Sequence, residues 1–132
     1  MIGLDTNILV RALIADEPAQ AASAQRFMQE RCSRETPGLV NLIVLCEFAW
    51  TLRKTYRLGR SEIAAAIERM LDNPALRVEK HQSAVAALRR YRSHGDDFPD
   101  ILIGEVNRAL GCEVTATFDR KAGRLDGFVL VD

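Results

Sequence analysis

The amino-acid sequence predicts an α/β fold: a three-layer sandwich in which helices flank a mainly parallel central sheet of four or five short strands. Two observations predict this class. Short apolar runs alternate along the chain with longer segments whose apolar residues recur at helical spacing. Glycine, proline and asparagine separate these segments. Strands that alternate with helices favour a parallel sheet, because each helix can carry the chain back to the start of the next strand.

The first half of the chain is expected to hold two strands and four helices. Pro18 suits the first turn of a helix, and Gly59 ends one. A helix that opens at Ser61 is closed by the pair Asn73-Pro74. In order, the segments are a strand at 2–4, helices at 7–14 and 19–31, a strand at 39–40, and helices at 42–56 and from 61 to the Asn-Pro pair.

The second half is expected to hold three strands and two helices. Gly95 stops the first of these helices, and Gly111 is a suitable C-terminal cap for the second. In order, the segments are a strand at 76–78, helices at 81–93 and 98–110, and strands at 114–118 and 128–131.

Composition indicates one globular domain spanning residues 1–132, with 48% hydrophobic and 27% charged residues. The 18 basic residues balance the 18 acidic ones, which disfavours a simple basic nucleic-acid-binding module. Three widely spaced cysteines indicate neither disulfides nor a zinc site. No apolar run approaches the roughly 20 residues that span a bilayer, so we expect a soluble cytoplasmic protein that does not associate with membranes.

Two aspartates follow predicted strands. Asp5 comes directly after the first strand and Asp119 directly after the fourth. Because ligands of parallel sheets bind beyond the carboxyl ends of the strands, we expect both side chains at the same edge. Each alone is also typical of a turn or a helix N-cap, so position alone does not establish a site.

Glu47 lies within a predicted helix that is apolar on almost every side, and we expect it to be at least partly buried. No Lys or Arg stands three or four residues away to neutralise it. A buried carboxylate must be protonated, paired through space or bound to a cation. A solvated gap in the apolar surface is the alternative.

Asp100 follows Pro99 in the first turn of its helix, where an acid complements the helix dipole. Asp96 and Asp97 are already available to cap that helix, which leaves Asp100 without a structural task. Hard cations such as Mg²⁺ and Mn²⁺ prefer carboxylate oxygens and can activate water for phosphodiester hydrolysis. We therefore interpret Asp5, Glu47, Asp100 and Asp119 as a catalytic metal site.

Other catalytic chemistry has little support in the sequence. His81 and His94 stand in polar helix-end settings, and no glycine-rich phosphate loop occurs. Basic residues that could offset repulsion between an acidic pocket and phosphate cluster at Arg53, Lys54 and Arg57, with Arg60 nearby. A second basic group contains Arg89, Arg90 and Arg92. For both groups a solvated helix face is an equal alternative.

These residues resemble the PIN-domain toxins of the VapC type. The opening Leu4-Asp5-Thr6-Asn7-Ile8-Leu9 and its continuation through Asp16-Glu17-Pro18-Ala19-Gln20 are similar to the start of those proteins. The apolar helix with Glu47 is similar to the second acidic position of the family. Phe98-Pro99-Asp100 resembles the third, where family members more often have Ala before the aspartate, and Thr117-Phe118-Asp119 resembles the fourth.

The resemblance implies a PIN fold and a metal-dependent endoribonuclease that hydrolyses RNA with Mg²⁺ or Mn²⁺. It also implies a homodimer and a small antitoxin protein that inhibits the nuclease. By this resemblance Asp5, Glu47 and Asp100 match the core metal ligands and Asp119 the more variable fourth. Thr117 matches a hydroxyl that supports the site, and Asn7 a residue that orients the first aspartate.

Three other classes of protein are alternatives. A non-catalytic RNA- or protein-binding module with the same fold is disfavoured because all four acids are present. A phosphoacceptor receiver domain needs an acidic pair after the first strand and a Lys after the last, and the chain has neither. A haloacid-dehalogenase-type phosphatase needs Asp-x-Asp, whereas residues 5–7 are Asp-Thr-Asn.

Overall fold

The computed structural model describes residues 1–94 and 97–132. The first part contains β1 (Ile2–Gly3), α1 (Thr6–Ile14), α2 (Pro18–Arg31), β2 (Gly38–Val40), α3 (Leu42–Lys54), α4 (Arg60–Asp72), β3 (Leu76–Val78) and α5 (His81–His94). The second part contains α6 (Phe98–Ala109), β4 (Thr115–Thr117), the 3-10 helix η1 (Ala122–Arg124) and β5 (Phe128–Leu130). The predicted α/β class, with short parallel strands between helices, is confirmed.

Polar side chains fix the starts of three helices. The Asp5 carboxylate accepts a hydrogen bond from the Thr6 amide at the start of α1. Asn41 accepts from the Val44 amide at the start of α3, and Asp97 accepts from the Asp100 amide at the start of α6. These bonds satisfy amide groups that have no partner within the helix itself. Pro18 begins α2, as predicted.

The five strands form two parallel sheets rather than one. Residues 2–3, 38–40 and 76–78 make a three-stranded sheet in the order β1-β2-β3, and β4 pairs with β5 separately. Asp5 and Asp119 therefore follow strands of different sheets, and the expectation that they share one sheet edge is wrong. Strands of two or three residues contain too little pattern to determine which neighbour they pair with.

The buried core lies in the helical part of the molecule. Phe48, Leu45 and Leu52 of α3 are fully buried, and apolar residues of α4, α5 and α6 pack into the same cluster. By contrast, β4 and β5 contain no buried residue. We call residues 115–132, which hold β4, η1 and β5, the C-terminal unit.

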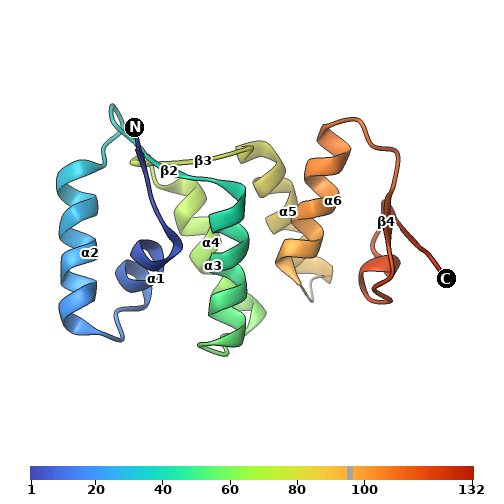
Figure 1. The fold of residues 1–132 in the computed structure, drawn as a ribbon, viewed down its shortest axis with the longest axis horizontal. Helices are drawn as coiled ribbons and strands as arrows, with labels where there is room; N and C mark the ends of the chain where they lie inside the picture. Colours follow the sequence, from blue (N-terminus) through green and yellow to red (C-terminus); the bar gives the residue numbers. More distant parts are fainter. Residues whose placement is uncertain (95–96) are drawn as a thin grey trace.

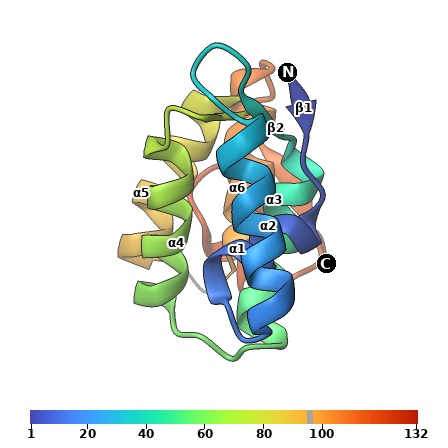
Figure 2. The same cartoon turned by 90° about the vertical axis from the view of Figure 1, so that its left-hand side faces the viewer.

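The C-terminal unit stands at one end of an elongated molecule. In Figure 1 it lies beyond α6, at the opposite end from α2, with α3 between β1 and α6. Figure 2, viewed from the α2 end, shows α4 and α5 along one side and β1 with α3 along the other. The two sheets are thus separated by helices.

Within the described residues, no helix combines the length and hydropathy needed to cross a membrane. The three cysteines are unpaired: Cys32 is buried, Cys46 half-buried and Cys112 exposed.

Candidate functional site

A cavity of about 730 Å³ opens between the end of α3, the start of α6 and the C-terminal unit. Its wall carries both acidic and basic side chains, many of them from the second half of the chain. The lining residues are Arg53, Lys54, Arg90, His94, Asp97, Asp100, Ile101, Asp119, Lys121, Ala122, Arg124, Leu125 and Asp126.

Asp100 is half-buried in the first turn of α6. Burial raises the pKa of its carboxyl group, the carboxylates of Asp97 and Asp119 raise it further, and Arg53 opposes this shift. Asp97 is the N-cap of α6, so the prediction that Asp100 is not needed as a cap is confirmed. The other capping candidate, Asp96, lies outside the described residues. A group whose negative charge is disfavoured in this way favours a nearby cation.

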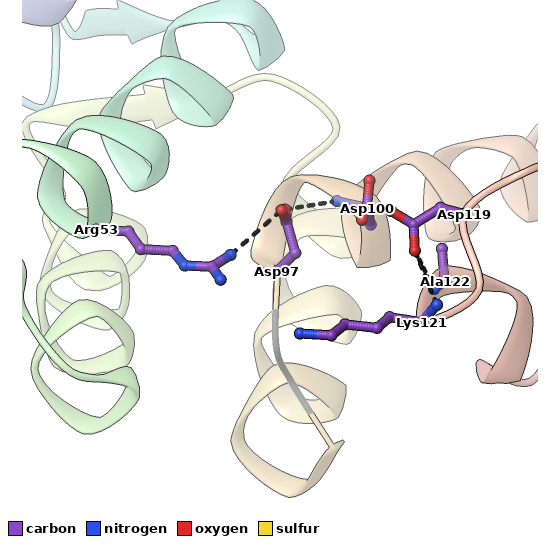
Figure 3. A network of polar contacts seen from close by, with 6 residues as sticks. All are labelled: Arg53, Asp97, Asp100, Asp119, Lys121 and Ala122. Carbon is purple, nitrogen blue, oxygen red and sulfur yellow. Dashed lines mark hydrogen bonds and ion pairs between the residues drawn. The ribbon is translucent and has the colours of Figure 1, made fainter.

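Asp119 lies beside Asp100, as Figure 3 shows. Its Oδ1 accepts hydrogen bonds from the amides of Lys121 and Ala122 at 2.8 and 3.0 Å. Thr117 Oγ1 in turn accepts from the Asp119 amide at 3.0 Å. Asp119 therefore organises the turn that leads into η1, and this turn aims its carboxylate at the cavity that Asp100 also lines.

Asp5 and Glu47 form a second group, joined by Thr6. Asp5 Oδ1 accepts from the Thr6 amide at 2.8 Å, and Thr6 Oγ1 donates to Glu47 Oε1 at 2.8 Å. Neither carboxylate lines the cavity. Asn7, predicted to orient Asp5, is exposed in the first turn of α1, and the bonds to Asp5 and Glu47 are made by Thr6 instead.

Glu47 is exposed, so the expectation that it is partly buried is wrong. Ile43 and Trp50, on the same face of α3, are also exposed, by 73% and 55%. The apolar pattern of α3 predicts burial on almost every side, but only the opposite face reaches the core. Cys46, the residue before Glu47, is half-buried; burial raises the pKa of its thiol, and the carboxylates of Asp97 and Asp100 raise it further.

The donor set fits a hard cation only in part. Asp100 and Asp119 provide two carboxylates on one cavity wall, which is the chemistry Mg²⁺ and Mn²⁺ prefer. Among residues 1–94 and 97–132, however, no three His, Cys, Asp or Glu side chains come close enough together to hold a metal. Within one chain, the four predicted acids thus form two separate pairs.

Basic side chains surround the acidic pair. Arg53 and Lys54, both predicted to bind RNA, line the cavity, whereas Arg57 is not among the lining residues. The Arg53 guanidinium contacts the Asp97 carboxylate at 3.4 Å. Figure 3 shows Arg53 reaching from α3 towards Asp97, across from Asp100 and Asp119. The cavity therefore presents positive charge to an anionic polymer beside the carboxylates.

Sequence reasoning missed several contributors. Thr6 lies between Asp5 and Asn7, the two residues that the sequence predicts for the site. Its hydrogen bond to Glu47 depends on the fold, because the two residues are far apart in the chain. Lys121 and Arg124 line the same cavity as Asp119. Their position two and five residues after Asp119 is the sequence feature that could have predicted this. His94, which the sequence places in a polar helix-end setting, is exposed and also lines the cavity.

In a comparison with protein families, the family model described as PIN domain matches residues 2–127. Comparison with curated proteins gives no match. The matched range includes Asp5, Glu47, Asp100 and Asp119.

Proposed function

This chain belongs to the PIN-domain family, and we propose that it is an endoribonuclease that depends on Mg²⁺ or Mn²⁺ and acts as the toxin of a toxin–antitoxin pair. PIN domains are generally nucleases that act on RNA and use divalent metals. The specific metal dependence, the toxin role, the antitoxin and a homodimeric state are the parts that we propose. The toxin role is supported by the resemblance of residues 4–9 and 16–20 to VapC-type toxins.

The observation that carries the proposal is the pair Asp100 and Asp119 on one wall of a cavity that also holds Arg53, Lys54 and Lys121. Carboxylates beside cations suit a site that must bind both a metal ion and an RNA phosphate. Burial raises the pKa of Asp100 and the carboxylates of Asp97 and Asp119 raise it further, so a cation beside Asp100 would stabilise its charged form.

Asp100 and Asp119 would hold the metal, with Asp5 and Glu47 as the further ligands that we propose. When bound, a divalent cation supplies water activation and neutralises charge that develops on the phosphate. Arg53 and Lys54 would position the RNA backbone. Thr117 would fix the direction of Asp119 through its bond to the Asp119 amide, and Thr6 would fix that of Glu47.

Cleavage of RNA by protein freed of any inhibitor tests the proposal. We expect unlabelled structured RNAs to be cleaved with Mg²⁺ or Mn²⁺, and cleavage to stop on chelation and in Asp100→Asn. Asp72→Asn is the matched control, because Asp72 ends α4 and does not line the cavity. Wild-type protein that leaves every RNA intact with both metals would contradict the proposal.

A non-catalytic binding module is the second candidate. It is favoured by one observation: the described residues of a single chain bring no three potential ligands together. Calorimetric titration with Mn²⁺ distinguishes the two candidates. Uptake by the wild type that is lost in Asp100→Asn supports the nuclease, and absence of uptake at millimolar Mn²⁺ supports the binding module.

A further inference from the structure

We propose that Trp50 stacks an unpaired base of RNA next to the candidate site, so that the preferred substrate is single-stranded. The inference rests on the proposed function and adds to it the structural class of the RNA. It follows from the exposure of Trp50, from its place on α3, from the residues around it and from the shape of the cavity nearby.

Trp50 is the only tryptophan of the chain, and it is exposed by 55%. Tryptophan is usually among the more buried residues of a protein, so this exposure is unusual. Within the part of the chain that the structure describes, the aromatic and cation–π contacts are made by other rings, and none involves Trp50. The indole ring is therefore open to a ligand.

On α3, Trp50 lies between an acid and a base. Glu47 precedes it by three residues and Lys54 follows it by four, which places all three side chains on one face of the helix. All three are exposed. Lys54 lines the cavity, and Glu47 is one of the four acids predicted to hold the metal. A strand of RNA that runs along this face from Lys54 towards Glu47 would pass the Trp50 ring.

A small hollow joins Trp50 to the cavity. Trp50 borders this hollow together with Phe98 and Pro99 from the first turn of α6. Arg53 and Asp97 line both the hollow and the larger cavity, and they form an ion pair at 3.4 Å, which Figure 3 shows. Because the two spaces share these residues, a base on Trp50 and a phosphate in the cavity can belong to the same short stretch of RNA.

The chemistry around the ring suits an unpaired nucleotide. Stacking on an aromatic ring accepts any base, since every base has a π face. Arg53 lies three residues after Trp50 and supplies positive charge for a neighbouring phosphate. Proteins that bind single strands commonly combine aromatic rings with cations in this way, whereas the bases of a duplex are already stacked on one another.

The cavity favours the same class of substrate. Its volume of about 730 Å³ lies in the range of small-molecule sites, about 300–1,000 Å³, which suits a short stretch of one strand rather than a duplex. Lys54 stands on one wall, and Lys121 and Arg124 stand on the C-terminal unit. Among residues 1–94 and 97–132, none of these three cations forms an ion pair. They are available to phosphates that flank the one beside Asp100 and Asp119.

Fluorescence of the single tryptophan tests the inference without any cleavage. Wild-type protein in chelator, which keeps RNA intact, is titrated with a short oligoadenylate, with the same strand paired to oligouridylate, and with an abasic strand of equal length. We expect saturable quenching by the oligoadenylate and little by the other two, which carry phosphates but offer no free base. Equal quenching by the abasic strand, or none by the oligoadenylate, overturns the inference.

Variants of Trp50 separate stacking from packing. Trp50→Phe keeps an aromatic ring and should bind labelled oligoadenylate nearly as well as the wild type. Trp50→Leu keeps only apolar bulk and should weaken binding about tenfold, as expected for the loss of one stacked base. In cleavage assays Trp50→Leu should raise KM by a similar factor and change kcat little.

Ile43→Ala is the matched control, because Ile43 is exposed by 73% on the same face of α3 and lines neither the hollow nor the cavity. It should change neither KM nor binding, and circular dichroism checks that each variant folds. Binding by Trp50→Leu that equals the wild type overturns the inference.

The outcomes distinguish this inference from the proposed function. Cleavage of RNA that is unaffected by Trp50→Leu supports the nuclease and overturns the stacking site. Quenching by oligoadenylate in a chain that cleaves no RNA supports the stacking site and the binding module instead. Iodide quenching of the RNA-free protein is the remaining check: a Trp50 that iodide does not reach would be covered by another protein surface, and this would overturn the inference.

Discussion

Thr6 Oγ1 donates a hydrogen bond of 2.8 Å to Glu47 Oε1, across 41 positions of the sequence. The bond joins the first residue of α1 to the middle of α3. Because the preceding residue is Asp5, whose carboxylate accepts the Thr6 amide, one buried threonine sets the positions of two acids. A side chain without catalytic chemistry of its own thus governs the geometry of the N-terminal half of the candidate site.

Replacement of Thr6 by Val should therefore weaken function more than stability. Loss of the bond to Glu47 is expected to cost about 1 kcal/mol of unfolding free energy, because that carboxylate is exposed. We expect RNA cleavage to fall about tenfold, as a misplaced ligand raises the barrier by roughly 1.4 kcal/mol. Thr6→Ser keeps the hydroxyl and should retain most of the activity. Urea unfolding and RNA cleavage rates measure the two effects; equal activity of Thr6→Val and the wild type would contradict the role of Thr6.

The sequence predicts the elements well because their signals are local. The bounds of β3 agree with the prediction, and α6 ends one residue before the predicted end. Helical spacing, Pro18 and Gly111, which has φ of 98°, act over a few residues of chain. Each of these signals is present in the sequence itself, so no knowledge of distant contacts is required.

The division of the strands into two sheets could not be predicted in this way. Strand pairing joins residues far apart in the chain, and strands as short as β1 and β4 hold little information about their neighbours. The exposure of Glu47 could not be predicted locally either, because an apolar pattern does not show which face of α3 meets the core, and the face that carries Ile43 and Trp50 is exposed. Local patterns identify the acids but not how they are distributed in space.

Arg90 and Glu105 form the most buried ion pair in the described part of the chain, at 2.8 Å. Arg90→Ala should lower the free energy of unfolding by about 2–3 kcal/mol, because it leaves a buried carboxylate without its partner. Arg90→Met combined with Glu105→Leu should recover much of this loss. Arg92→Ala, which breaks the exposed pair with Glu68, is the control and should have little effect. Urea unfolding of the wild type and these three variants tests this, and a double variant no more stable than Arg90→Ala would contradict it.

Gly104 should not tolerate the substitution that usually stabilises a helix. Gly→Ala within a helix normally gains about 0.5–1 kcal/mol, but here the new Cβ would meet the Phe128 ring. We expect Gly104→Ala to destabilise the protein by about 1–3 kcal/mol and to loosen the C-terminal unit. Phe128→Leu in the same chain should reverse part of the loss. Thermal unfolding and hydrogen exchange at β5 measure it; unchanged protection at β5 would argue against this packing.

Asp97 caps α6 and also lies beside Asp100. Its contribution to helix stability and any contribution to metal binding can be measured separately. Asp97→Asn keeps a capping oxygen and should leave stability nearly unchanged, whereas Asp97→Ala should cost about 1 kcal/mol. If Asp97 serves only as a cap, Mn²⁺ affinity in Asp97→Asn should fall far less than in Asp100→Asn. Calorimetry on both variants measures this, and an equal loss of affinity would make Asp97 a metal ligand.

Lys54 and Arg57 provide a matched comparison for RNA binding. Both are exposed and basic, but Lys54 lines the cavity and Arg57 is not among the lining residues. If RNA follows the cavity, Lys54→Ala should raise the KM for RNA several-fold while changing kcat little. It should also lower the slope of log affinity against log salt by about 0.7, the value for one lost contact to a single-stranded phosphate. Arg57→Ala should change neither quantity, because the Arg57 charge is not placed at the cavity wall. Cleavage kinetics at several salt concentrations give both readouts, and a larger effect at Arg57 would move the RNA path away from the cavity and towards the turn after α3.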